Sequence, residues 1–253
     1  MKKGEGKGGQ LTIFIIVAIL IIAIVALFFA FPKLRTAVGF EKLETPENFI
    51  QTCLEDTIKE NVEIISSQGG SLEPSPSVEY LDEKIQYLCY TPQKYQACVV
   101  QIPFLEKNIE EEIKNSIKED VDFCFNSLKE NYDNRGYTTS LKKGDIVVEL
   151  LPQKIVTTIK NEFVFSKDEN VQKRETFRVV LNNNLYELTA IAQSIMVSEI
   201  SFGGGLEQFY MELYTDVKVE AIRPFTEDTT IYILTDRNTQ DKFKFAFQSW
   251  DLG

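Results

Sequence analysis

The sequence contains no histidine, and it has only one tryptophan and four cysteines in 253 residues. Without histidine, the chain cannot build a Ser-His-Asp or Cys-His catalytic group, or a metal or haem site that needs an imidazole ligand. Positive charge is also scarce, because 27 Lys and Arg stand against 38 Asp and Glu, a net charge of −11. A nucleic-acid-binding surface needs basic residues to neutralise phosphates, so we expect no nucleic-acid partner.

Local motifs for metals, cofactors and catalysis are missing as well. The cysteines match no CxxC metal site in their spacing. Asp120 and Asp122 lack the glycine and the terminal glutamate of a calcium-binding loop. Gly203–Gly205 has neither the spacing nor the Lys-Ser/Thr of a phosphate-binding loop. We therefore expect no metal, no cofactor and no enzymatic activity.

One segment lacks charge altogether, the 21-residue apolar run from Leu11 to Phe31. As a helix this run would be about 32 Å long, which is enough to cross a bilayer once. We therefore predict a transmembrane helix over residues 11–31, with the lipid bilayer as a partner. The apolar core of a conventional secretory signal has roughly 7–15 residues and a small-x-small cleavage site, so an uncleaved anchor fits this run better.

The residues just before the apolar run are basic and rich in glycine, and they read Lys7-Gly8-Gly9-Gln10-Leu11-Thr12. Together with the run they resemble an archaeal class III signal peptide, the kind carried by type IV pilin-like proteins. The resemblance implies that a prepilin-type peptidase cuts between Gly9 and Gln10 and leaves the apolar run in the mature protein. The chain departs from many bacterial pilins at Phe14, where they carry glutamate. A further likeness to archaeal pilin-like surface proteins rests on Cys53–Glu55, Gln68–Gly70 and Lys242–Phe247.

The orientation across the membrane does not follow from the lysines and arginines alone. Three lysines precede the apolar run, and three basic residues follow it by residue 42, so the positive-inside count is nearly a tie. The acidity of the chain after the run and its even number of cysteines favour an oxidising exterior. We therefore expect a single-pass protein with a short cytoplasmic N-terminus and the C-terminal domain outside the cell.

Two amphipathic helices are predicted in the first half of the exposed part. The first begins with Thr45 as N-cap and Pro46 at the first helical position, and Gly69 and Gly70 end it. The second covers about Phe104–Glu130. Apolar residues follow the helical period on both, at Phe49, Ile50, Cys53, Leu54, Ile58, Val62 and Ile65, and at Ile109, Ile113, Ile117, Val121, Cys124 and Leu128. Cys53 and Cys124 thus lie on the two faces that should pack together.

The other two cysteines lie on a predicted hairpin between these helices. If Cys89 faces Cys98, then Tyr87 faces Val100 and Ile85 faces Ile102, all on one face. We predict disulfides Cys53–Cys124 and Cys89–Cys98, which stabilise the fold by roughly 4 and 3 kcal/mol in the loop-entropy model. Four buried free thiols are the alternative to these disulfides.

Short β-like runs dominate the rest of the chain. Strands are expected over residues 146–151, 154–159, 162–165, 176–181, 217–222, 230–234 and 242–247, the last two forming a hairpin. A charged loop is expected over 167–174. Helices are expected over about 185–200 and 206–213. Trp250 either caps the sheet edge or contacts a partner.

The fold class expected is α+β: an N-terminal transmembrane helix, a helix–hairpin–helix unit and an antiparallel β-rich unit with one or two helices. The divisions are a leader over 1–10, the membrane helix over 11–31, a connector over 32–44, a disulfide-stapled region over 45–132 and a β-rich region over 137–253. Whether the last two form one core or two stays open.

The function expected is a non-enzymatic, membrane-anchored pilin-like protein outside the cytoplasm, in surface adhesion or as a filament or complex subunit. It would assemble with itself or with other pilin-like subunits. The alternative is an unprocessed single-pass anchor that presents a binding domain within a membrane complex.

Overall fold

The computed structural model describes residues 44–249, with gaps at residue 95, residues 203–206 and residues 224–228. The chain from Pro46 onward forms one compact unit. Its helices are α3 (Pro46–Ser67), α4 (Leu105–Ser116), α5 (Lys118–Asn134), α6 (Leu185–Phe202) and α7 (Glu207–Leu213). Its strands are β1 (Ser77–Tyr80), β2 (Glu83–Tyr90), β3 (Val99–Val100), β4 (Thr138–Lys142), β5 (Ile146–Leu151), β6 (Lys154–Ile159), β7 (Glu162–Lys167), β8 (Asn170–Arg174), β9 (Phe177–Asn182), β10 (Val217–Ile222), β11 (Thr229–Asp236) and β12 (Lys242–Gln248).

The fold class predicted from the sequence is wrong in its first element. Within the described residues, no helix is long and apolar enough to cross a membrane. Residues 11–31, on which the transmembrane prediction falls, lie outside the described range. Hydropathy alone led to that prediction, and the α+β part of the fold class is what the structure contains.

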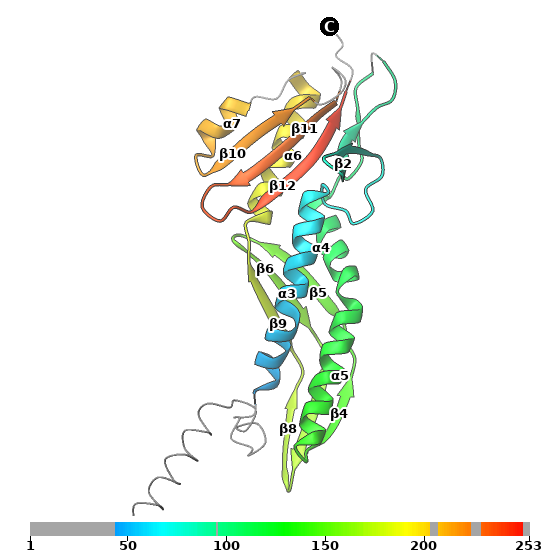
Figure 1. Cartoon of the computed structure of the whole chain (residues 1–253), viewed down its shortest axis with the longest axis vertical. Coiled ribbons are helices and arrows are strands. Elements are labelled where there is room, and N and C mark those ends of the chain that lie inside the picture. Colours follow the sequence, from blue (N-terminus) through cyan, green and yellow to red (C-terminus); the bar gives the residue numbers. More distant parts are fainter. Residues whose placement is uncertain (1–43, 95, 203–206, 224–228, 250–253) are drawn as a thin grey trace, which may run out of the picture. The chain divides into compact units, whose positions relative to one another are not determined.

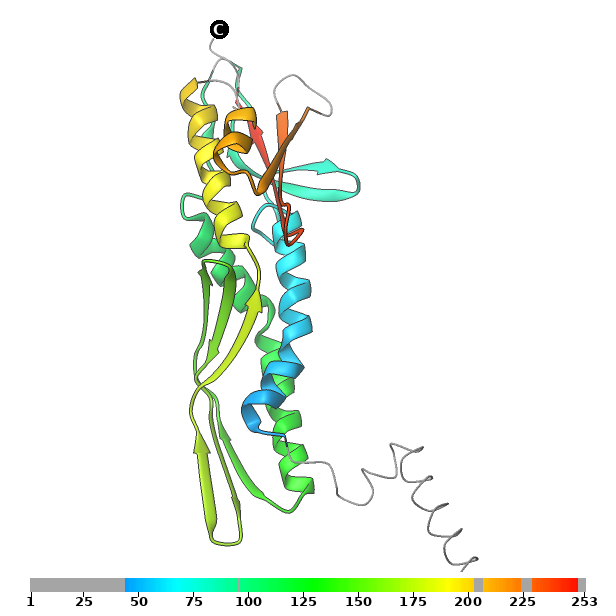
Figure 2. The same cartoon turned by 90° about the vertical axis from the view of Figure 1, so that its left-hand side faces the viewer.

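The strands form three sheets. Two of them have three strands each, in the orders β4-β7-β8 and β5-β6-β9, and all of their pairs are antiparallel. The third, which we call the mixed sheet, has the order β1-β2-β12-β11-β10, with β3 also paired to β2. In Figures 1 and 2, α3 and α5 lie side by side over the two three-stranded sheets, and the mixed sheet lies at the C-terminal end of α3. We call α3, α4, α5 and the three-stranded sheets the helix region.

The predicted apolar stripe of α3 is its buried face. The residues at 0–1% exposure are Ile50, Leu54, Ile58, Val62 and Ile65. Each contributes roughly 1.5–3 kcal/mol by leaving water. Gly69 and Gly70 follow the helix with φ of +81° and +93°. A Cβ on Gly69 would approach Gln86 Cβ to 2.8 Å, so glycine is needed both for the backbone conformation and for the space.

The second predicted helix is two helices, because the chain breaks at Ile117. Ile117 has φ −94° and ψ 0°, and α4 ends before it while α5 begins after it. Its side chain is still fully buried, as are Ile113 before it and Val121 after it. The apolar stripe therefore continues through the break, which is why sequence periodicity did not reveal it.

The hairpin predicted around the second cysteine pair has a different register. Cys89 lies opposite Val100 and not opposite Cys98, and β3 has only two residues. On its other side, β2 pairs in parallel with β12, the C-terminal strand. The first and last parts of the described unit therefore share one sheet.

Several strands were not predicted. The expected charged loop over 167–174 is the turn and second strand of a β7–β8 hairpin, with the pair Lys167–Asn170 closing a two-residue turn. Its strand β8 is exposed along nearly its whole length, so its sequence lacks the hydrophobic alternation of a half-buried strand. β1 and β4 were missed for the same reason, since neither has a fully buried residue.

Candidate functional site

Both predicted cysteine pairs are bonded. Cys53–Cys124 joins α3 to α5 with a Cα–Cα distance of 6.0 Å, and Cys89–Cys98 joins β2 to the residue before β3 with a Cα–Cα distance of 5.4 Å. All four cysteines are therefore in disulfides. The predicted processing residues Gly9 and Gln10, and also Trp250, lie outside the described residues.

Two carboxylates of the acidic run Glu110–Glu112 on α4 have structural partners. Glu110 pairs with Lys107 at 2.9 Å and accepts the backbone N–H of Leu150 at 3.0 Å. Glu112 accepts the backbone N–H of Leu72 at 3.2 Å. These carboxylates therefore fasten α4 to β5 and to the loop after α3. Within the described residues, no group of three or more Asp, Glu or Cys is arranged to hold a metal ion.

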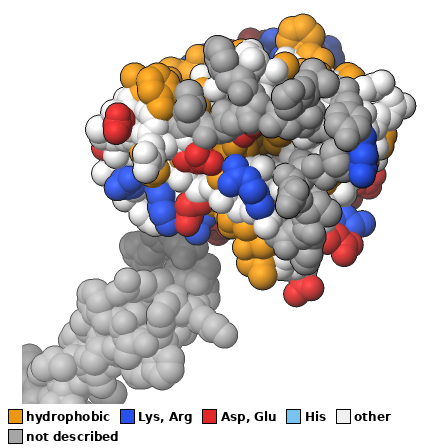
Figure 3. Space-filling model, turned by 90° about the horizontal axis from the view of Figure 1, so that it is seen from above, with side chains coloured by type: hydrophobic (Ala, Val, Ile, Leu, Met, Phe, Trp, Pro, Cys, Tyr) orange, Lys and Arg blue, Asp and Glu red, His pale blue; other side chains and the backbone are white. Residues whose placement is uncertain are grey.

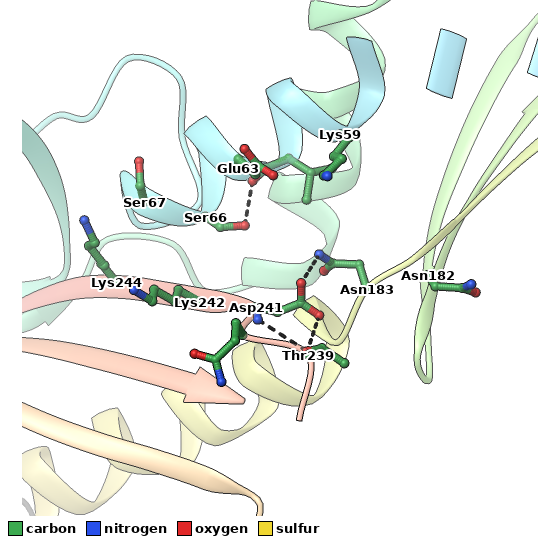
Figure 4. Close-up of a pocket in the computed structure, with 12 residues that line it drawn as sticks. Lys59, Glu63, Ser66, Ser67, Asn182, Asn183, Thr239, Asp241, Lys242 and Lys244 are labelled. Carbon is green, nitrogen blue, oxygen red and sulfur yellow. Dashed lines mark hydrogen bonds between the residues drawn. The ribbon is translucent and has the colours of Figure 1, made fainter. Parts of the chain in front are cut away.

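A pocket of about 600 Å³ lies where α3 meets the ends of β9 and β12, and we call it the junction pocket (Figure 4). It is lined by Lys59 and Glu63 on α3, by Asn182 and Asn183 at the end of β9, and by Asp241, Lys242 and Lys244 at the start of β12, among others. Lys244 forms an ion pair with Glu83 of β2. The pocket thus combines both signs of charge with amide groups, a composition suited to a polar ligand.

The serines of the junction pocket are bound to their own helix. Ser66 Oγ donates to the Val62 carbonyl at 2.6 Å, and Ser67 Oγ donates to the Ile64 carbonyl at 3.0 Å. Lys244, the pocket lysine that is mostly buried, is held by Glu83. A nucleophilic serine needs a base within hydrogen-bond reach, and the hydroxyl protons here are directed to carbonyl oxygens. The pocket is therefore arranged for binding contacts.

One wall of the junction pocket is a network that joins the β9–α6 connection to the β11–β12 turn. Asn183 Nδ2 donates to Asp241 Oδ1 and the backbone N–H of Asn184 donates to Asp241 Oδ2, both at 2.9 Å. Asn184 Nδ2 donates to Asp236 Oδ2 at 2.8 Å. Burial acts to raise the pKa of Asp236, but hydrogen bonds from the turn backbone at Thr239 and from the Asn184 amide outweigh it, and the pKa is lowered.

The sequence carries a local signal for one end of this network, the three asparagines Asn182–Asn184. Asn182–Asn184 precede α6, and Asn183 Oδ1 accepts the backbone N–H of Leu185 at 2.9 Å. Asparagine is favoured in such a position because its side-chain oxygen satisfies an N–H at a helix start. The partner carboxylates, about 50 residues later in the chain, could not be assigned from local sequence.

A buried polar pair lies between α6 and the mixed sheet. The Tyr232 hydroxyl on β11 donates to the carboxylate of Glu199 on α6, and the two residues are 0% and 7% exposed. Burial, followed by the nearby Glu199 carboxylate, raises the pKa of Tyr232 far above its ordinary value. The tyrosine is therefore a permanent donor at physiological pH, and it fastens α6 to the sheet.

The end of the molecule at which α6 terminates is shown in Figure 3. Its described surface has separate hydrophobic groups interrupted by charged side chains. On α6 and α7, large apolar side chains are exposed at Val197, Ile200, Phe209 and Leu213.

Comparisons with models of protein families, with curated proteins and with solved structures found no match.

Proposed function

We propose that this chain is exported and acts outside the cytoplasm as a non-enzymatic, pilin-like surface protein, in adhesion or as a subunit of an assembly. The observation that carries the proposal is the pair of disulfides, since structural disulfides persist mainly in oxidising compartments. Both half-cystines of Cys53–Cys124 lie on helix faces that pack together. This bond therefore belongs to the core of the fold.

The leader and the surface are consistent with this proposal. The basic, glycine-rich residues before the apolar run resemble a class III signal peptide, with processing between Gly9 and Gln10 by a prepilin-type peptidase. The pockets and the exposed apolar residues of α6 and α7 are suited to binding other molecules. Binding and assembly need such surfaces and do not need catalytic groups.

Thiol trapping in the native cells tests the location. Cells are lysed directly into a denaturing buffer that contains N-ethylmaleimide, so that buried free thiols also react. The intact mass of the chain is measured in this sample, and again after reduction and a second treatment with N-ethylmaleimide. We expect no adduct without reduction and four after it, because all four cysteines are paired. Four adducts in the unreduced sample would place the chain in a reducing compartment and overturn the proposal of export.

The N-terminal mass tests the processing separately. We expect the mature chain to begin at Gln10, and a Gly9→Val variant to retain the leader. A native chain that begins at Met1 would contradict the pilin-like part of the proposal while leaving export intact. Electron microscopy of the cell surface, with and without the gene, then tests whether filaments depend on this protein.

A further inference from the structure

A second pocket lies between the first turns of α6, the end of α7 and the start of β10. It has a volume of about 480 Å³, and the residues that matter for its chemistry are Tyr186, Glu187, Leu213, Tyr214, Asp216 and Asp236. We call it the tyrosine pocket. α7 is held beside α6 by the Ser194 and Tyr210 hydroxyls, whose oxygens are 3.0 Å apart, and both views show the two helices as neighbours (Figures 1 and 2).

We propose that the tyrosine pocket binds an arginine side chain of a partner polypeptide. The inference rests on the proposed function, because it names the class of partner that an assembly or adhesion protein would bind at this surface. The occupant follows from three properties of the pocket: its charge, one incompletely bonded carboxylate and its aromatic rim.

The charge of the pocket has one sign. Glu187, Asp216 and Asp236 contribute three carboxylates, and no lysine or arginine is among the residues that line it. The junction pocket, on the other side of the β11–β12 turn, has three lysines in its lining. Three carboxylates without a lining cation attract a positively charged group and repel acidic partners.

Glu187 is the carboxylate whose bonding is incomplete. One of its oxygens accepts the backbone N–H of Gln153 at 3.0 Å, while Oε2 is buried and has no hydrogen-bond partner. A buried acceptor without a donor costs free energy that a ligand can recover. A rotation of this carboxylate toward the pocket would let it accept an N–H from a guanidinium group.

The rim of the pocket favours arginine over lysine. Leu213 is 58% exposed and Tyr214 is 39% exposed, so both can cover the aliphatic stem of a long side chain. A planar guanidinium stacks on tyrosine rings and donates in pairs to carboxylates, whereas an ammonium is a compact and strongly hydrated charge.

The test uses the full chain, purified with both disulfides intact, and N-acetyl-arginine amide as the probe. Binding is followed by backbone amide shifts in NMR spectra, with N-acetyl-lysine amide and the neutral isostere N-acetyl-citrulline amide as comparisons. We expect saturable shifts at Leu213, Tyr214 and Asp216 with the arginine probe, weaker binding of lysine and no binding of citrulline. Equal shifts with citrulline would overturn the proposal, because charge would then play no part.

Two variants and a matched control locate the site. Asp216→Asn and Glu187→Gln should each weaken arginine binding by about tenfold, or 1.4 kcal/mol. Asp168→Asn, an exposed change on the β7–β8 turn, should leave it unchanged. The Asp216 residue is exposed, so its variant should keep the wild-type melting midpoint even if Glu187→Gln does not fold. An equal loss in Asp168→Asn would show that binding follows overall charge and would refute the site. Because purified protein is used, this outcome is independent of the thiol-trapping result.

Discussion

The helix region and the mixed sheet differ in how residues far apart in the sequence are joined within each of them. In the helix region two strand pairs, β5–β6 and β7–β8, join consecutive strands and two, β4–β7 and β6–β9, do not. The disulfide of this region joins residues 71 positions apart. In the mixed sheet the parallel pair β2–β12 brings together strands about 150 residues apart, while its disulfide spans only nine positions. The helix region thus has a covalent link that closes a long loop, whereas the longest connection within the mixed sheet is non-covalent.

The pair β2–β12 is supported by a buried apolar cluster that includes Ile85, Tyr87 and Ala246, and also by hydrogen bonds and an ion pair. Tyr87 Oη and Thr229 Oγ1 are 3.3 Å apart, and Lys244 pairs with Glu83. The backbone N–H of Thr91 donates to the Gln248 carbonyl at 3.2 Å. A long-loop disulfide reduces the entropy of the unfolded chain more than a short-loop disulfide does. Removing the two disulfides should thus have unequal effects.

The largest effect is expected from the double variant Cys53→Ala/Cys124→Ala. It should lower the free energy of unfolding by about 4 kcal/mol, because the long loop becomes free in the unfolded state. Urea denaturation followed by circular dichroism gives the value. A loss smaller than that of the other disulfide would contradict the comparison of the two regions.

The double variant Cys89→Ala/Cys98→Ala should cost about 3 kcal/mol by the same reasoning. Hydrogen exchange should also quicken locally at Thr91 and Gln101, which lie beside the short loop, while the α3 amides keep their rank order of protection. If the α3 amides lose protection first, the short disulfide stabilises the helix region as well. That result would contradict the expectation that each disulfide acts mainly on its own region.

Tyr232→Phe tests a non-covalent link of the mixed sheet. The change removes the hydroxyl that donates to the buried Glu199 carboxylate, and we expect a loss of about 2 kcal/mol. Tyr210→Phe is the matched control, since its hydroxyl bonds to the neutral and partly buried Ser194 hydroxyl. Equal losses in the two variants would show that burial of the charged acceptor adds nothing.

Gln51→Ala tests a weaker link in the helix region. The Gln51 side chain on α3 accepts the Val180 N–H at 3.2 Å and donates to the Val180 carbonyl at 3.5 Å, which covers part of the edge of β9. We expect a loss of about 1 kcal/mol, as is usual for exposed or partly exposed hydrogen bonds. The control Gln172→Ala, on exposed β8, should leave the free energy of unfolding unchanged. An increase in oligomer size in Gln51→Ala would show that the β9 edge had become available for pairing with another chain.

The smallest effect at neutral pH is expected from the ionisation of Tyr132 in the helix region. Burial, then the nearby Tyr137 and Glu47, raise the pKa of Tyr132 to about 12, with opposing effects from Arg174 and Arg135. The unfolded chain therefore loses this proton first, so stability is unaffected below pH 10 and falls as the pH rises from 10 through 12. Denaturation midpoints across this range should fall less steeply for Tyr132→Phe; parallel curves would contradict the assignment.

Much of the helix region could be predicted because its elements carry local signals. The stripe from Ile50 to Ile65 repeats at the helical period, and Gly69 and Gly70 end α3 where the backbone needs a positive φ. The transmembrane prediction for residues 11–31 used the same kind of local signal. It is not supported by any helix of the described residues.

The sequence by itself determined the amphipathic helices and most of the strands, because each depends on residue spacing within a few turns or one strand. Both disulfides also followed from the sequence: Cys53–Cys124 because the two cysteines lie on the apolar faces of two helices, and Cys89–Cys98 because they lie close together in the chain, although the strand register there differs. Only the tertiary structure decided that β2 pairs with β12, that Asn184 bonds Asp236, and that Glu187 and Asp216 line one pocket. These contacts join residues far apart in the chain, and many partners of similar polarity were equally possible for each. Local periodicity selects the face that an element buries, whereas the packing of the whole chain selects its partner.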